Sequence, residues 1–332
     1  MGPNTLLPLI PRKVLFGNPE KGLPQISPDG KRISYLAPLD GVLNIWIRTI
    51  GGEDDQPVTK DTGRGVHEYF WAQDNNHIMY LQDAGGNENW RLYGVNLKTN
   101  EFRDFTPDKN VRVEILDYDK HRPNELLISM NKENPDFHDA YHLDLETGAL
   151  TMIAKNPGNI SGWLADPDLK IRGAKAALPD GSFELLIRDD KNLEWRKLLT
   201  WNFEDGRLSS PLALSRDGRY IFLKDSRDTN TSRLVKMDLL NREIKVLAED
   251  LQYDVGGAMV NPDTHEIEAV SFYRDRNEWM ALTDNVKNDF EVIRKLHPGE
   301  FTVISRSALD DLWLISFVID QGPISYFIYN RK

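Results

Sequence analysis

One stretch of the chain approaches the motif of a catalytic serine. A nucleophile of the α/β-hydrolase type needs the pattern Gly-x-Ser-x-Gly on a sharp turn between a strand and a helix. The stretch 158–162, GNISG, comes nearest, but its serine, Ser161, stands one position too late. It also falls at the start of a repeated unit rather than between a strand and a helix. The sequence therefore predicts no nucleophile elbow and no catalytic triad in this chain, which by itself is not an enzyme.

The side chains that might bind metal are poorly spaced for it. His138 and His142 are four residues apart, and on a strand that rises about 3.4 Å per residue they would lie roughly 13 Å from each other. The polar stretches 74–76 and 225–230 lack the glycine and the terminal glutamate of a calcium loop. The chain has no cysteine, which excludes thiolate ligands and disulfides. We predict no metal site and no cofactor.

A turn motif that recurs along the whole chain sets the positions of all these residues. Its clearest copy is 25–36, QISPDGKRISYL, in which Pro28, Asp29 and Gly30 form a tight turn between two apolar strands. A second copy is 211–226, with its turn at Asp217. From Asp29 the turns follow at intervals of 45, 45, 49, 49, 46 and 47 residues. The five weaker copies turn at Asp74, Asp119, Asp168, Asp263 and Asp310.

Seven units of about 47 residues use the whole chain, and this period is typical of a β-propeller. The sequence therefore predicts an all-β fold: a seven-bladed β-propeller with four antiparallel strands per blade, here called a to d from the centre outwards. Residues 1–332 form one domain. No long helix is expected, and strand d of the sixth blade is placed at Glu291–Arg294. The blades are expected to start near residues 23, 67, 113, 160, 210, 254 and 301.

The two ends of the chain leave the closure of the ring open. The seventh unit has strands near 301–305, 312–319 and 324–329, but no fourth strand before Lys332. The run Arg12–Phe16, RKVLF, resembles the other d strands and would close the ring by pairing with 324–329. In the alternative interpretation it is a loose leader or a single helical turn, and the fourth strand lies after Lys332.

Composition and charge limit the class of partner. The net charge of −11 favours solubility and argues against a nucleic-acid partner or an anionic membrane surface. The first 13 residues have no charged segment before their apolar run, which Pro8 interrupts. We therefore predict no signal peptide, no membrane span and a cytoplasmic location.

Two stretches of the chain resemble a known family. They are 18–48, NPEKGLPQISPDGKRISYLAPLDGVLNIWIR, and 64–97, which contains DAGGNENWRLY at 83–93. Both are similar to the amino-terminal propeller of the prolyl oligopeptidase family of serine peptidases, in its acylaminoacyl-peptidase and dipeptidyl-peptidase branch. The later blades share only the repeat.

The resemblance implies a function for the whole protein. An α/β-hydrolase catalytic domain with a Ser-Asp-His triad would follow Lys332, and the propeller would cap its active site and select small peptides. One alternative is a free-standing scaffold propeller that binds protein partners, as Tol-associated propellers do. Another is a propeller enzyme with ligands converging on the central channel.

The loops expected to face the substrate supply the candidate site residues. The alternation of strand direction places the b–c and d–a loops on one face, here called the near face, and the a–b turns on the opposite, far face. In dipeptidyl-peptidase relatives, propeller carboxylates bind the amino terminus of the substrate, and the resemblance implies this role for Asp83 and Glu88. Arg64, Arg274 and Arg276 would hold carbonyl or carboxylate groups. The double-glutamate signature of those relatives is absent, and for each residue the alternative is a salt bridge between loops or domains.

Overall fold

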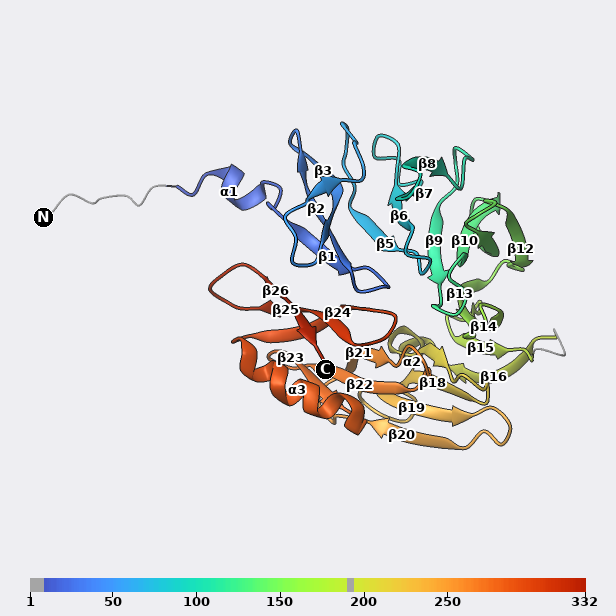
Figure 1. The fold of residues 1–332 in the computed structure, drawn as a ribbon. Coiled ribbons are helices and arrows are strands. Elements are labelled where there is room, and N and C mark those ends of the chain that lie inside the picture. Colours follow the sequence, from blue (N-terminus) through green and yellow to red (C-terminus); the bar gives the residue numbers. More distant parts are fainter. Residues whose placement is uncertain (1–8, 190–193) are drawn as a thin grey trace, which may run out of the picture.

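The computed structural model describes residues 9–189 and 194–332. Within these residues the strands form seven antiparallel sheets arranged in a ring (Figure 1). The predicted seven-bladed β-propeller is therefore confirmed. The innermost strands of blades 1 to 7 are β1 (Gly22–Ile26), β5 (Glu68–Trp71), β9 (Val113–Asp117), β13 (Ile160–Ala165), β17 (Ser210–Leu214), β21 (Val255–Val260) and β24 (Glu300–Arg306).

Blades 1 to 5 have the expected four strands, paired in sequence order from the centre outwards. The outer strands of these five blades are β2 (Arg32–Leu39), β3 (Val42–Thr49) and β4 (Gln56–Pro57); β6 (His77–Gln82), β7 (Arg91–Asn96) and β8 (Glu101–Asp104); β10 (Glu125–Asn134), β11 (Phe137–Asp144) and β12 (Leu150–Ala154); β14 (Ile171–Ala177), β15 (Phe183–Ile187) and β16 (Arg196–Trp201); and β18 (Tyr220–Asp225), β19 (Arg233–Asp238) and β20 (Ile244–Ala248).

The repeated turn has the geometry that its residues suggest. The Ser27 hydroxyl donates to Asp29 Oδ1 at 2.6 Å, and the same carboxylate accepts the Lys31 N–H at 3.1 Å. Gly30 follows at a φ of +68°, which glycine adopts at little cost. Ser215 and Asp217 repeat the arrangement in blade 5, with the hydroxyl again 2.6 Å from Oδ1. The motif thus closes each of these a–b hairpins with hydrogen bonds between residues of the same turn.

The hydrophobic core lies between the blades. The second strands are nearly continuous in buried residues, as in β6 and β10, because both faces of a blade are covered by its neighbours. One cluster, for example, joins Met79 and Leu92 of blade 2 to Leu126 and Ile128 of blade 3. Each blade is therefore stabilised mainly by the blades on either side of it.

Blade 6 departs from the prediction. In the described part of the chain it contains only β21, β22 (Ile267–Tyr273) and β23 (Asn277–Ala281), and the prediction of a strand at Glu291–Arg294 is wrong. That segment lies in helix α3 (Asp284–Leu296), which buries Val286, Phe290 and Ile293. The spacing of these three residues matches one face of a helix, and Phe290 packs edge-on against Trp279 of β23. The helix thus covers the sheet edge that a fourth strand would have paired.

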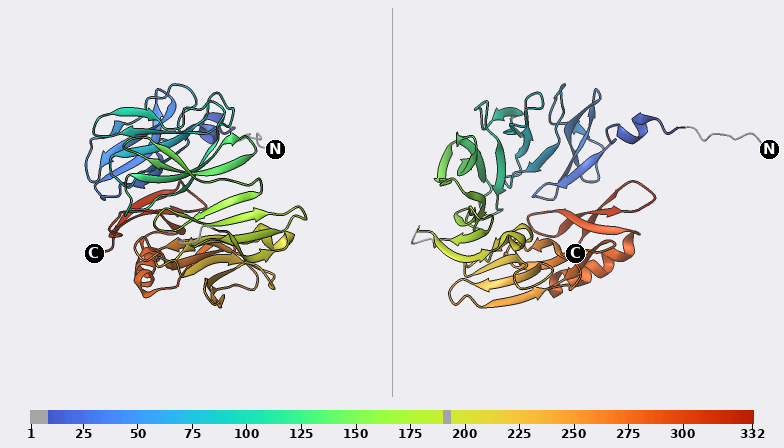
Figure 2. Two further views of the ribbon diagram at one scale, coloured as in Figure 1. Left: turned by 90° about the vertical axis from the view of Figure 1, so that its right-hand side faces the viewer. Right: turned by 180° about the vertical axis from the view of Figure 1, so that it is seen from behind.

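Blade 7 also has three strands, β24, β25 (Leu312–Val318) and β26 (Ser325–Asn330). Arg12–Phe16 forms the short helix α1, which buries none of its residues and extends away from the ring on the side of blade 1 (Figure 2). The hypothesis that this segment is the closing strand is therefore wrong, and the helical-turn alternative is observed. A further short helix, α2 (Phe203–Leu208), lies in the connection between blades 4 and 5.

Among residues 9–189 and 194–332 the first and last blades share no strand, and they meet through contacts between β1 and the pair β24 and β25. The Ile26 N–H donates to the Ser305 hydroxyl at 3.1 Å, and the Ala308 N–H donates to the Pro28 carbonyl at 2.7 Å. In the part of the chain that is described, no helix is long and apolar enough to cross a membrane.

Candidate functional site

Arg64, Asp83 and Glu88 come together on the near face of blade 2. The Asp83 side chain is fully buried, and its Oδ1 lies 3.1 Å from Arg64 Nε. Its Oδ2 accepts the Glu88 N–H at 3.0 Å. A buried carboxylate needs such partners because its desolvation is costly. The Asp83 carboxylate therefore stabilises the loop 83–90 by accepting the Glu88 N–H, and Arg64 compensates its negative charge.

Glycine is required at one point of this loop. Gly86 has a φ of +85°, and a Cβ atom there would lie 2.5 Å from Arg64 Nη1. A side chain at position 86 would thus displace the arginine from Asp83. The sequence pattern DAGGNENW carries this constraint at its second glycine, Gly86.

Glu88 differs from the other four candidates. Its backbone lies in the left-handed region, at a φ of +58°, which is uncommon for a residue other than glycine and is found at many functional sites. Its side chain is exposed, and among the described residues no hydrogen bond or ion pair engages its carboxylate. The buried Asp83 carboxylate sustains this conformation through the Glu88 N–H. The loop therefore presents one unpaired negative charge on a fixed backbone.

Arg274 and Arg276 form a separate group on blade 6. Arg274 lies 2.7 Å from a carboxylate oxygen of Asp250 and 2.7 Å from one of Glu278. Arg276 lies 2.6 Å from Asp320 Oδ2. The hydrogen bonds to Asp250 and Asp320 raise the pKa values of the two guanidinium groups. This geometry matches the salt-bridge alternative, since both arginines tie neighbouring near-face loops together.

The near face also exposes large apolar side chains that sequence reasoning did not single out. Phe203 of α2 is 55% exposed, Leu251 is 85% exposed, and Tyr273 is 71% exposed. All three lie in or beside connections on this face, where a surface loop would ordinarily carry polar residues. Apolar residues in the segments between strands are the signal that would have identified them.

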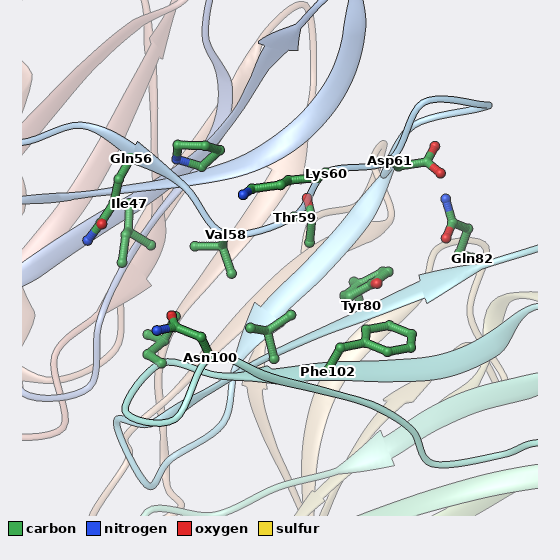
Figure 3. Close-up of a pocket in the computed structure, with 13 residues that line it drawn as sticks. Ile47, Gln56, Val58, Thr59, Lys60, Asp61, Tyr80, Gln82, Asn100 and Phe102 are labelled. Atoms are coloured by element: carbon green, nitrogen blue, oxygen red, sulfur yellow. The ribbon is translucent and has the colours of Figure 1, made fainter.

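A groove of about 810 Å³ separates the outer parts of blades 1 and 2 (Figure 3). It exists because β4 is only two residues long and leaves the face of β6 and β7 partly uncovered. Burial raises the pKa of Tyr80 at its base. Asp61 at its edge already accepts the N–H groups of Gly63 and Gly65. The lining residues are Ile47, Gln56, Pro57, Val58, Thr59, Lys60, Asp61, Tyr80, Gln82, Val95, Leu97, Asn100 and Phe102.

The residues first considered for catalysis and metal binding have ordinary partners. The Ser161 hydroxyl donates to the Lys175 carbonyl at 3.1 Å. His142 Nε2 lies 2.9 Å from a carboxylate oxygen of Glu125, whereas His138 Nδ1 lies 3.3 Å from the Ser129 hydroxyl. Within residues 9–189 and 194–332, no group of three or more metal-ligating side chains is assembled.

Two curated proteins are similar to nearly all of this chain. It is 36% identical to dipeptidyl aminopeptidase BIII of Pseudoxanthomonas mexicana over 325 residues, which are 98% of the chain and 47% of that protein. It is 24% identical to dipeptidyl peptidase family member 6 of Caenorhabditis elegans, over 97% of the chain and 46% of that protein. The chain thus spans about half the length of the curated relatives it matches. No family model matches the chain.

Solved structures share the fold. A prolyl endopeptidase structure superposes with a TM-score of 0.66 at 10% identity, over 94% of this chain and 48% of that chain. The β-propeller domain of the Trilobed protease from Pyrococcus furiosus, described as having an open velcro topology, gives a TM-score of 0.59 at 13% identity. That match covers 94% of this chain and 93% of the other.

Proposed function

This chain is a seven-bladed propeller of the prolyl oligopeptidase family, and from that premise we propose that it is the non-catalytic, substrate-selecting part of a serine peptidase. The carrying observation is the match to dipeptidyl aminopeptidase BIII, which covers 98% of this chain but only 47% of that protein. The other half of the protein would hold the α/β-hydrolase domain, attached beyond Lys332. Cytoplasmic location and peptide substrates remain predictions.

The near face supports a domain placed against it. Phe203, Leu251 and Tyr273 are exposed there, and a domain that covers this face would bury them. Phe16, in the helix α1 that precedes blade 1, is a further exposed apolar side chain, at 81%. Strand β26 ends on the far face. There the Arg331 N–H donates to the carbonyl of Asp311, which lies in an a–b turn. A fourth strand after Lys332, paired with β26, would cover the exposed sheet edge and return the chain to the near face.

Within this arrangement Glu88 would bind the free amino group of a peptide. Its carboxylate is exposed and unpaired in the described structure, and its backbone is fixed by Asp83. A hydrogen bond to a charged group contributes about 1.5–3 kcal/mol. In the full-length protein, Glu88→Gln should therefore lower kcat/KM for peptides with a free amino terminus by roughly 10–150-fold.

The matched comparison uses substrates with a blocked amino terminus, which should lose little activity in Glu88→Gln. Glu53→Gln, which changes an exposed carboxylate in a far-face turn, should behave like the unaltered protein with both substrate types. Equal losses on free and blocked peptides would assign Glu88 to an interdomain salt bridge. No loss on either would remove it from the site.

The location of the catalytic serine is tested separately. A fluorophosphonate probe should label the full-length protein on a serine outside residues 1–332. Labelling within these residues would refute the non-catalytic role. A full-length protein that is not labelled and cleaves no peptide would favour the free-standing scaffold instead.

A further inference from the structure

The seven a–b turns on the far face are not equal in length. Five of them contain five residues between strands a and b, as in 27–31 of blade 1. The turn of blade 3, 118–124, contains seven residues, and the turn of blade 6, 261–266, contains six. These turns surround the far end of the central channel, since strand a is the innermost strand of each blade. The two longest turns therefore supply extra chain at the channel mouth.

The turn of blade 3 reaches the opposite side of the ring. Lys120 Nζ donates to the Ala308 carbonyl of blade 7 at 2.7 Å. It also lies 2.5 Å from Asp263 Oδ1 of blade 6. Blade 3 is separated from blade 6 by two blades in one direction and by three in the other. Direct contact between their innermost turns must therefore cross the channel.

Asp119 makes a second set of contacts across the channel. Its Oδ2 lies 3.0 Å from His265 Nε2 of blade 6, and its Oδ1 lies 4.0 Å from Arg216 Nη1 of blade 5. The Asp119 side chain is only 7% exposed and the Lys120 side chain only 14%. Charged residues in turns are ordinarily solvated. Their burial here shows that the turns of blades 3, 5, 6 and 7 pack against one another.

The base of the long turn is fixed from the other side. The Tyr118 ring stacks on Phe70 of blade 2, with centroids 5.2 Å apart and planes 12° apart. Within the turn, the His121 N–H donates to Asp119 Oδ1 at 2.8 Å. The turn is thus held at both its root and its tip, as expected for a segment with one defined position.

We propose that turn 118–124 is a latch that closes the far mouth of the channel, with Asp119 and Lys120 fastening it to blades 5, 6 and 7. Peptides then enter the channel only from the near face; this second statement rests on the proposed function. The chemistry that fastens the latch is carried within this chain, so its existence can be tested without the catalytic domain.

The first test measures the position of the latch. Because the chain has no cysteine, the exposed residues His121 and Leu309 are changed to cysteine and spin-labelled. A narrow distance distribution is expected. Lys120→Met should broaden it, and Asp263→Asn, which alters a 58% exposed side chain, should do the same with little risk to folding. Lys98→Met, in an exposed far-face turn, is the matched control and should leave the distribution narrow. A broad distribution in the parent, or no response to either latch variant, would overturn the latch.

The second test measures entry through the far mouth. Gly162 lies exposed on the innermost strand β13, and a Cβ there would meet no atom within 4 Å. In the full-length protein freed of other cysteines, Gly162→Cys is reacted with a maleimide-capped pentapeptide. Adding Lys120→Met should speed the reaction at least fivefold. An equal rate with a loosened latch would show that the latch does not close the mouth. A protein without peptidase activity would refute the proposed function but leave the spin-label result in force.

Discussion

The two faces of the propeller differ in how fully their polar side chains are paired within this chain. On the far face, turn residues are capped locally, as in Ser27 and Asp29, and cross-linked over long distances, as in Asp119 and His265. On the near face, Glu88 has no partner among the described residues, and Tyr273 is 71% exposed. Far-face contacts between residues of this chain stabilise the ring. A surface that holds an unpaired carboxylate on a fixed backbone is suited to bind a partner or substrate.

The largest expected effect concerns the buried ion pairs that join blade 7 to helix α3 of blade 6. Arg331 Nη2 lies 2.9 Å from Asp289 Oδ2 of α3, and Arg331 also pairs with Asp310. Its guanidinium lies 4.4 Å from the centre of the Trp313 ring. Since removing one member of a buried pair leaves an uncompensated charge, Arg331→Met should lower the free energy of unfolding by about 3–5 kcal/mol. Urea unfolding of the chain measures this.

The near-face counterpart of that change is Arg276→Met. Arg276 is 48% exposed and Asp320 is 70% exposed, so water screens this pair, and Arg276→Met should lower the free energy of unfolding far less than Arg331→Met does. If Arg331→Met and Arg276→Met lowered the free energy of unfolding equally, the distinction between a far face with buried pairs and a near face with exposed pairs would be wrong.

A smaller effect is expected at Asp83, the buried exception on the near face. Asp83→Ala leaves the Glu88 N–H without its acceptor, while the half-exposed Arg64 can regain water. We therefore expect a loss of about 2 kcal/mol in unfolding free energy, with faster amide hydrogen exchange confined to residues 83–90. Asp275→Ala, an exposed near-face change, is the matched control. Unchanged exchange in Asp83→Ala would mean that the loop does not depend on this carboxylate.

The smallest effect concerns Asp117, at the root of the latch. Desolvation by the channel wall raises the pKa of this carboxyl group to about 6, and the nearby Asp119 and Asp166 add to the rise. The folded state then binds more protons than the unfolded state between about pH 4 and pH 6, so stability falls as pH rises through this window. Asp117→Asn removes that loss. It should stabilise the chain above pH 6 and have no such effect below pH 4.

The size of this effect is limited by solvent. A pKa of about 6 for Asp117 corresponds to roughly 3 kcal/mol at most, but Asp117 is exposed to solvent, and screening should reduce the gain to about 1 kcal/mol. Unfolding curves at pH 4, 6 and 8 measure it. Glu114→Gln, on the same strand, is the control, and the same pH profile in both variants would remove the assignment to Asp117.

Features that depend on neighbouring residues were predictable from the sequence. The turn at Asp29 is closed by Ser27 and Gly30 within the same segment. The recurrence of this turn motif along the sequence therefore predicts seven blades. The stretch 83–93 likewise carried the family resemblance. The role of Asp83 was different: only the structure buries its carboxylate against Arg64 and leaves Glu88 unpaired.

The tertiary structure alone decided what depends on residues that are distant in the sequence. The segment 284–296 has both a strand-like position in the repeat and a helical spacing of apolar residues, and the uncovered edge of β23 selected the helix. Lys120 and Ala308 are 188 positions apart, and no local pattern brings them together. Their contact exists because closing the ring places the turns of blades 3 and 7 on opposite sides of one narrow channel. Local hydrogen bonds thus determine each hairpin, whereas the closed ring determines which charges become buried partners.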